Sequence, residues 1–203
     1  MAAPPPPTKP FRRVAVFCGA NAGASPSYRA AAVALGTELA ARGIGIVYGG
    51  GNVGLMGAVA DGALSAGGEV HGVITEALRV KELAHLDLTS LIVVDTMHER
   101  KAAMADRADA FVALPGGFGT FDELFEVITW TQLGIHEKPC GMLNHRGFFD
   151  DLVTFIDKTT TAGFIKPAHR DTVVVERDGP AMLKSLRAWE PARIPKIVDR
   201  DQR

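Results

Sequence analysis

The feature that most constrains the fold is a regular alternation of short apolar runs with longer amphipathic stretches. Several of the runs are almost continuously apolar, as expected for parallel strands that helices cover on both faces. The alternation predicts right-handed βαβ units, and therefore a Rossmann-like α/β fold in which helices flank a doubly wound, mainly parallel sheet. We expect strands at 14–18, 44–49, 70–75, 90–95, 109–115, 138–144 and 171–176, and helices at 27–42, 54–67, 97–107, 120–134, 147–162 and 180–188.

The two ends of the chain differ in composition from this pattern. Residues 1–11 include a run of prolines, which favours an extended, solvated tail, and residues 191–203 are polar with many charges. The beginning lacks the apolar segment of a secretory signal, and no stretch approaches the ~20 apolar residues of a membrane helix. We therefore expect a single domain over 12–190 between two tails, in a protein without a membrane partner.

Composition limits the classes of partner. The formal net charge of -1 over 203 residues does not favour binding to nucleic acid or to an anionic membrane. Cys18 and Cys140 lie in apolar runs and are expected to be small core residues rather than a disulfide, which fits a cytoplasmic protein.

Glycine-rich loops follow the first two predicted strands, where ligands of such sheets bind. The loop at 18–28 lacks the GxGxxG spacing of a dinucleotide site, and it is either a tight turn or a ligand contact. The loop at 48–57 has three successive glycines, which are costly to order. Gly50 and Gly51 therefore indicate either an anion or ribose site before a helix N-terminus, or close packing of strand, turn and helix.

The segment ALPGGFGTFDE at 113–123 follows the fifth predicted strand. The backbone amides of Gly116, Gly117, Gly119 and Thr120, with the Thr120 hydroxyl, could surround a phosphate at the start of the next helix. Glu123 would then have to point away from the phosphate, toward a sugar. The alternative is a capping box formed by Thr120 and Glu123, with the glycines supplying only the turn.

The predicted helix at 97–107 places Met97, Arg100 and Met104 on one face. A buried Arg100 would need a partner, and it could hold Glu123 in the ionised form or contact a sugar phosphate. Lys101 is expected to be a solvated surface residue. A carboxylate beside a ribose can stabilise the cation that forms when an N-glycosidic bond breaks, and it can activate the attacking water.

Two motifs, PGGFGTFDE and MHERK, make the chain resemble the Lonely Guy (LOG) family, and YGGGNVGLMG and ITWTQLGIHEKPCGMLN are similar to segments of that family. The resemblance extends from about Val14 to Leu186. It implies a cytokinin-activating phosphoribohydrolase, a hydrolase that converts cytokinin riboside 5'-monophosphates, and AMP, to the free N6-substituted adenine and ribose 5-phosphate. It implies a homodimer with the pocket near the subunit interface. We expect no cofactor and no metal, because no recognisable metal-ligand spacing is formed by His98, His136, His145 and Glu137.

The same resemblance implies roles for particular residues. Arg100 and Glu123 match the family's essential arginine and glutamate. Substrate contacts are implied for Met97, Lys101 and Glu82, and phosphate contacts for Gly116, Gly117, Gly119 and Thr120. The alternative from another class is a non-catalytic nucleotide-binding module, which would not need the Arg100–Glu123 pair. Candidates for the base-side pocket, each of which could equally belong to the core, are Leu83, Leu86, Trp130 and Phe164.

Overall fold

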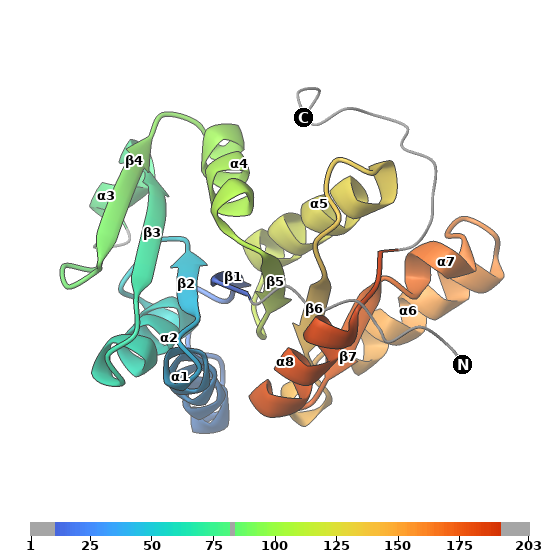
Figure 1. Cartoon of the computed structure of the whole chain (residues 1–203), viewed down its shortest axis with the longest axis horizontal. Helices are drawn as coiled ribbons and strands as arrows, with labels where there is room; N and C mark the ends of the chain where they lie inside the picture. Colours follow the sequence, from blue (N-terminus) through green and yellow to red (C-terminus); the bar gives the residue numbers. More distant parts are fainter. Residues whose placement is uncertain (1–10, 82–83, 192–203) are drawn as a thin grey trace, which may run out of the picture.

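The computed structural model describes residues 11–81 and 84–191, and these form one seven-stranded sheet with the strand order β4-β3-β2-β1-β5-β6-β7 (Figure 1). Every neighbouring pair of strands is parallel. This confirms the predicted Rossmann-like fold and each of the expected strands. The strands are β1 (Arg13–Phe17), β2 (Gly45–Tyr48), β3 (Val70–Thr75), β4 (Ser90–Val94), β5 (Ala110–Ala113), β6 (Cys140–Leu143) and β7 (Val173–Glu176).

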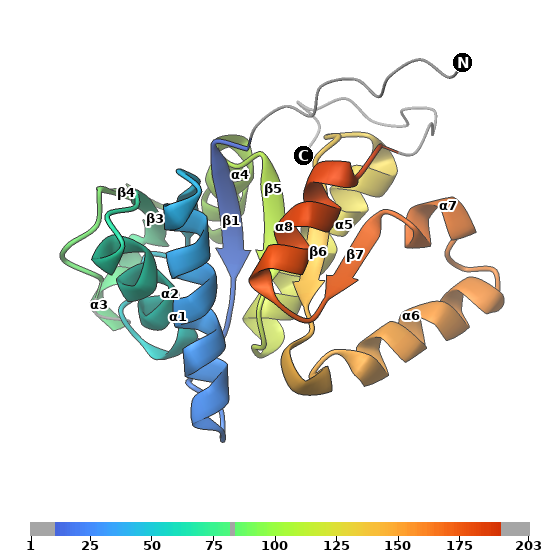
Figure 2. The ribbon, with the colours of Figure 1, turned by 60° about the horizontal axis from the view of Figure 1, so that its bottom comes forward.

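Helices cover both faces of the sheet, as Figures 1 and 2 show. Alternate residues of β1 point to opposite faces: Val14 and Val16 pack in one core with α1, α2 and α8, and Ala15 and Phe17 in another with α4 and α5. The helices are α1 (Pro26–Ala41), α2 (Gly54–Ser65), α3 (Glu76–Lys81), α4 (Met97–Arg107), α5 (Phe118–Leu133), α6 (Asp150–Thr161), α7 (Pro167–Arg170) and α8 (Gly179–Ala188), with a 3-10 turn, η1 (His145–Gly147).

The six helices expected from the sequence are all present, whereas α3, α7 and η1 were not predicted. These three elements are only six, four and three residues long. Such lengths give an apolar pattern too few repeats to be distinguished from a loop.

The strand order reverses direction between β1 and β5. From β1 the chain adds β2, β3 and β4 on one side, and then β5, β6 and β7 on the other side. The loops that leave the carboxyl ends of β1 and β5 therefore diverge, and this is where open α/β sheets form a ligand crevice. The glycine-rich loops after β1 and β5 therefore border the same crevice.

The structure excludes one of the two interpretations of Thr120 and Glu123. The helix α5 begins at Phe118, two residues earlier than expected, with Gly117 as its N-cap and without a side-chain cap. Thr120 consequently lies inside the first turn, so Thr120 and Glu123 do not form a capping box. The capping box belongs to α4, where the Thr96 side chain accepts from the backbone of Glu99 and the Glu99 side chain accepts from that of Thr96.

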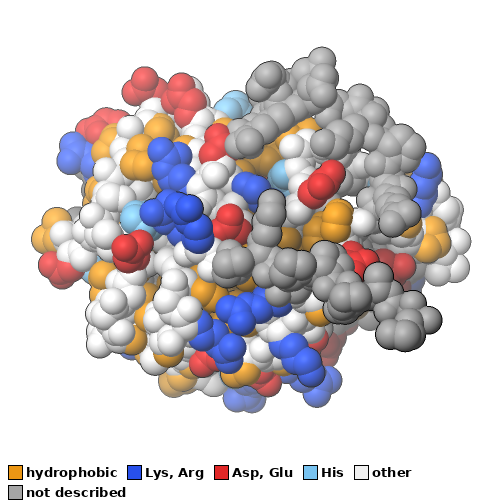
Figure 3. All heavy atoms as spheres, viewed as in Figure 1, with side chains coloured by type: hydrophobic (Ala, Val, Ile, Leu, Met, Phe, Trp, Pro, Cys, Tyr) orange, Lys and Arg blue, Asp and Glu red, His pale blue; other side chains and the backbone are white. Residues whose placement is uncertain are grey.

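Other expectations concern the surface and the chain ends. Cys18 and Cys140 are free and buried, as predicted. On the face shown in Figure 3, side chains of both charge signs are interspersed, consistent with the net charge of -1. In the part of the chain that the structure describes, the helices are too short or too polar to cross a membrane. Apart from Phe11 and Pro191, the expected tails at 1–11 and 191–203 lie outside the described residues.

Candidate active site

A cavity of about 330 Å³ lies where the loops after β1, β2, β5 and β6 meet, a volume at the lower end of the range for ligand pockets. Its walls come from the 18–23 loop after β1, from Leu55 and Met56 at the start of α2, and from Phe148 after β6. The segment after β5 contributes Pro115, Gly116, Gly117, Gly119, Thr120 and Glu123, and α4 contributes Arg100. The structure therefore brings together most of the residues that the sequence singled out.

The N-terminus of α5 opens onto this cavity. Because no side chain in the described part of the chain caps it, the amides of its first turn have neither a helical acceptor nor a capping oxygen there. Gly116 must be a glycine, because a Cβ there would collide with the Thr120 side chain and would come within 2.9 Å of the Gly19 nitrogen. The amides and the positive end of the helix dipole together form a place for an anion.

Gly117 and Gly119 differ from Gly116, because a Cβ at either position would meet no described atom within 4 Å beyond the adjoining residues and the backbone of α5 itself. Neither residue has a positive φ, and Gly117 is in an extended conformation that any residue can adopt. Neither the packing nor the backbone of this chain therefore requires a glycine at these positions. Both residues line the cavity, and their bare backbone leaves room for a molecule that approaches the main chain.

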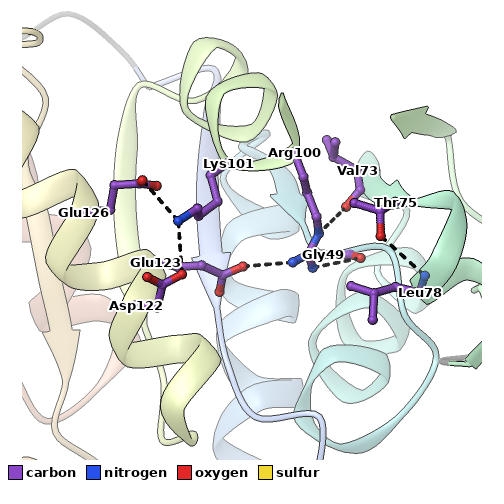
Figure 4. Close-up of polar contacts among 9 residues, drawn as sticks. All are labelled: Gly49, Val73, Thr75, Leu78, Arg100, Lys101, Asp122, Glu123 and Glu126. Atoms are coloured by element: carbon purple, nitrogen blue, oxygen red, sulfur yellow. Dashed lines mark hydrogen bonds and ion pairs between the residues drawn. The ribbon is translucent and has the colours of Figure 1, made fainter. Parts of the chain in front are cut away.

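Arg100 lies one turn into α4, and its side chain is only 7% exposed. Its Nε donates to the Val73 carbonyl at 3.0 Å and its Nη2 to the Gly49 carbonyl at 3.2 Å, while its Nη1 lies 3.3 Å from Oε1 of Glu123 (Figure 4). A carbonyl within β3 and one directly after β2 thus hold the guanidinium in one orientation. The expectation that a buried Arg100 has a partner is confirmed.

The glycines after β2 determine how this loop packs against Arg100 and its surroundings. A Cβ on Gly49 would collide with the Arg100 guanidinium, so a glycine is required for Arg100 to reach its carbonyl. Gly50 has a φ of +78° and accepts a hydrogen bond from the His85 backbone, and Gly51 forms a β-bridge with Ala84. Gly50 and Gly51 are not among the described residues that line the cavity. For this loop, the structure favours the close-packing interpretation.

Glu123 belongs to the second turn of α5, and its side chain, 11% exposed, points toward Arg100 (Figure 4). Burial, and then the nearby charge of Glu123, raise the pKa of the Cys18 thiol far above its usual range. A thiol in this environment stays protonated and is a poor nucleophile. The reactive groups of the cavity are therefore the carboxylate and guanidinium rather than the cysteine.

Two residues expected to contact a substrate, Lys101 and Met97, are not among the described residues that line the cavity. Met97 is 41% exposed. Lys101 is not the solvated residue expected, because its side chain is only 11% exposed and its Nζ lies 3.1 Å from carboxylates of both Asp122 and Glu126. A third residue, Glu82, lies outside the described residues.

One wall of the cavity is aromatic and was not predicted from the sequence. The rings of Tyr28, in the first turn of α1, and Phe148 meet edge to face with centroids 6.0 Å apart. Both residues follow strands that end at the cavity, and this position in the sequence could have indicated them. Of the suggested base-side residues, Leu86 and Phe164 are exposed and Trp130 is half-buried, and Leu83 lies outside the described residues.

The sequence is similar to known proteins over most of its length. A protein-family model described as "Possible lysine decarboxylase" matches residues 56–186. The probable cytokinin riboside 5'-monophosphate phosphoribohydrolase LOGL9 of Oryza sativa subsp. japonica is 52% identical over 181 residues, which cover 89% of this chain and 80% of that protein. The cytokinin riboside 5'-monophosphate phosphoribohydrolase LOG7 of Arabidopsis thaliana is 49% identical, covering 89% and 83% of the two chains.

Solved structures share the fold at lower identity. The molybdenum cofactor carrier protein of Chlamydomonas reinhardtii has a TM-score of 0.66 at 21% identity, and the two structures match over 87% of this chain and 98% of that one. A molybdenum cofactor binding protein of Rippkaea orientalis has a TM-score of 0.66 at 22% identity, covering 89% and 98%. The plant proteins are much closer in sequence, at 49–52% identity. They show that the chain belongs to the Lonely Guy (LOG) family, with the cytokinin riboside 5'-monophosphate phosphoribohydrolases.

Proposed function

We propose that the protein hydrolyses the N-glycosidic bond of cytokinin riboside 5'-monophosphates, and of AMP, to give the free adenine base and ribose 5-phosphate. The observation that carries the proposal is the Arg100–Glu123 pair on the wall of a cavity into which the uncapped N-terminus of α5 opens. The activity printed in the names of the plant relatives supports the same reaction.

The 5'-phosphate binds at the start of α5. The amides of Gly117, Gly119 and Thr120 donate to its oxygens, and the helix dipole favours its negative charge. Glu123 follows Gly119 by four residues, which places it about 6 Å further along the helix axis. A nucleotide held by its phosphate at the first turn therefore extends its ribose toward Glu123.

Hydrolysis then follows from the position of the carboxylate. As the bond from C1' to the base nitrogen breaks, its electron pair goes to the base, and the ribose carbon becomes cationic. The Glu123 carboxylate stabilises this cation and accepts a proton from the water that attacks C1'. The base leaves and acquires a proton, so that the net reaction consumes one water. Arg100 orients the Glu123 carboxylate, since the guanidinium is itself held by two backbone carbonyls.

The description of the family model suggests lysine chemistry, which the geometry does not favour. A lysine that forms a Schiff base needs a neutral amine, usually through a lowered pKa. Burial lowers the pKa of Lys101, but hydrogen bonds from Nζ to Glu126 and Asp122 outweigh that effect, and the pKa is raised overall. Lys101 therefore remains an ammonium ion near neutral pH.

The direct test is incubation of the protein with N6-isopentenyladenosine 5'-monophosphate and, separately, with AMP, followed by chromatography of the products. We expect release of the free base together with one equivalent of ribose 5-phosphate. Comparison of kcat/KM for the two substrates then measures the preference for cytokinin nucleotides. Tight nucleotide binding by calorimetry without release of base would instead support a non-catalytic nucleotide-binding module.

The role of Glu123 is tested by Glu123→Gln. The amide keeps the size of the side chain but cannot take the proton from water, so kcat is expected to fall about 100- to 10,000-fold. Thermal unfolding and circular dichroism check that the variant is folded. The matched control, Glu38→Gln, removes a carboxylate from α1 that pairs with Arg42 outside the cavity, and it should leave kcat unchanged. Near-normal turnover of Glu123→Gln would show that Glu123 has no chemical role.

We also propose a homodimer that pairs through α5. A shallow groove runs along this helix between apolar side chains, of which Phe118 is 93% exposed and Phe125 is 39% exposed. Phe118 and Phe125 are seven residues apart and therefore lie on the same face of α5, where they form an apolar surface suited to a second copy of the chain. The surface adjoins the cavity, since α5 contributes to both. A cytoplasmic location is proposed because both cysteines are free, which fits a reducing compartment.

A further inference from the structure

The three glycines at 49–51, here called the glycine loop, are held by the segment that leads from α3 to β4. The His85 backbone amide donates to the Gly50 carbonyl at 3.0 Å, and Gly51 forms an isolated antiparallel bridge with Ala84. Glycine loses more conformational freedom on ordering than any other residue, so a run of three has little rigidity of its own. The conformation of the glycine loop therefore depends on contacts from outside it.

The side chain of His85 ties this segment to α2. His85 is only 6% exposed, and its Nε2 lies 3.2 Å from Oδ1 of Asp61 in α2. The backbone amide of Asp87 donates to Nδ1 of the same ring at 3.2 Å. In the neutral imidazole an accepting Nδ1 leaves the hydrogen on Nε2, which therefore donates to Asp61. Both ring nitrogens are thus engaged within the chain, and neither is left for a substrate.

The glycine loop in turn contacts the proposed catalytic pair. Nη2 of Arg100 donates to the Gly49 carbonyl at 3.2 Å, and Nη1 of the same guanidinium lies 3.3 Å from Oε1 of Glu123 (Figure 4). The Gly49 carbonyl belongs to the planar peptide unit that joins Gly49 to Gly50. A change in the backbone of Gly50 would therefore turn the carbonyl that holds Arg100.

We propose that His85 is a positioning residue, which ties the glycine loop to α2 through its contact with Asp61. The loop holds the Gly49 carbonyl that orients Arg100, and Arg100 orients Glu123. This inference rests on the proposed hydrolysis, in which the carboxylate has to face the ribose. Because the His85 ring does not touch the reacting atoms, its loss is expected to lower the rate rather than weaken the binding of the nucleotide.

The first test compares kcat and KM for AMP in His85→Ala, which removes both ring contacts. Misplacement of a reacting group costs up to about 100-fold in rate, so kcat is expected to fall about 10- to 100-fold. KM should stay within about threefold of the wild-type value, because the amides at the start of α5 are unchanged. In His85→Gln the side-chain amide can still donate to Asp61, so this variant should recover most of kcat.

The matched control is His169→Ala, which removes a histidine of α7 that is 8% exposed and is not among the described residues lining the cavity. Loss of either buried histidine should lower the melting temperature by about 2–4 °C. Only His85→Ala should lower kcat. Circular dichroism and light scattering check that each variant keeps the fold and the assembly state of the wild type.

A variant in α2 tests the same contact if His85→Ala does not fold. Asp61→Ala removes the acceptor of the His85 ring from a side chain that is 48% exposed, and it should lower kcat without raising KM. The double variant should be no slower than His85→Ala alone, because both changes break one contact. Asp61 also lies 3.6 Å from Arg29, and Arg29→Ala, which removes only that exposed pair, should leave kcat unchanged.

Hydrogen exchange measures how firmly the glycine loop is held, independently of activity. Peptides that cover residues 49–53 and 84–89 should exchange faster in His85→Ala and in Asp61→Ala than in the wild type, because the backbone hydrogen bond between the two segments opens more often. In Arg29→Ala both peptides should exchange at the wild-type rate.

The outcomes separate this inference from the proposed function. If wild-type protein releases no base from either nucleotide, the proposed hydrolysis is wrong, and hydrogen exchange still decides whether His85 holds the glycine loop. If the wild type is active and His85→Ala keeps normal kcat or normal exchange of both peptides, the positioning role is overturned. A raised KM at unchanged kcat, or losses that add in the double variant with Asp61→Ala, would also overturn it.

Discussion

At the scale of single residues, the glycines around the cavity fall into two groups. Gly49 and Gly116 are required by the chain itself, because a side chain at either position would collide with Arg100 or Thr120. Gly117 and Gly119 face open space and have no such requirement. For Gly117 and Gly119, the presence of glycine is explained by the approach of a bound molecule rather than by folding.

This difference predicts the effect of Gly119→Ala. The residue lies in the first turn of α5 without a positive φ, so alanine should leave the free energy of unfolding unchanged or raise it by about 0.4–1 kcal/mol. The added methyl group occupies the space proposed for the phosphate, so KM for AMP should rise about tenfold or more. Thermal unfolding and steady-state kinetics measure the two effects.

A matched control for this prediction is Gly179→Ala, at the first position of α8, where a Cβ would make only ordinary contacts with Leu35 and Glu38. It should affect stability in the same direction and leave KM unchanged. An unchanged KM in Gly119→Ala would argue against a phosphate at the start of α5.

At the scale of elements, the two helices that form the site begin in different ways. The N-terminus of α4 is satisfied from within the chain, since Thr96 Oγ1 accepts from the Glu99 amide at 3.1 Å and Glu99 Oε2 accepts from the Thr96 amide at 3.1 Å. The N-terminus of α5 has only Gly117 as a cap and opens into the cavity. The capped start of α4 thus fixes the helix that carries Arg100, whereas the start of α5 can bind an anion.

The capping box of α4 predicts the effect of Thr96→Ala. Loss of the side-chain cap should lower the free energy of unfolding by about 1 kcal/mol. Because Arg100 lies in the next turn, fraying of α4 should also reduce kcat, while Thr96→Ser, which keeps the hydroxyl, should preserve both quantities. Denaturant unfolding and kinetics provide the measurement. Equal stability of the alanine and serine variants would contradict the assigned cap.

At the scale of the whole molecule, the sheet order determines where the site forms. The loops after β1 and β5 are far apart in the sequence, but the two strands are hydrogen-bonded neighbours at the point where the order reverses. Residues 18–23 and 55–56 and most of the segment 115–120, with Glu123, therefore reach one cavity. The proposed α5 interface lies beside it, so that assembly and activity are expected to depend on the same helix.

The interface predicts that the wild-type protein has the mass of a dimer in light scattering. Replacing Phe118 and Phe125 by glutamate places two charges in the apolar surface and should yield monomers, since buried unpaired charges are strongly unfavourable. The control is Phe155→Glu, at an exposed position on α6 outside the groove, which should remain dimeric. A monomeric wild type, or a dimeric double variant, would contradict the proposed interface.

The amino-acid sequence alone determined the seven strands, the six longer helices and the glycine-rich segments after β1, β2 and β5, because these features depend on local periodicity and on the backbone freedom of glycine. It also indicated Arg100 and Glu123 as partners. Only the tertiary structure decided what each group contacts. Arg100 needs the carbonyl groups of Val73 and Gly49, Lys101 is held by Asp122 and Glu126, and the capping box that was one interpretation of Thr120 and Glu123 does not form on α5. These contacts join residues distant in the chain, so their geometry is set by how the strands are ordered and how helices pack on the sheet.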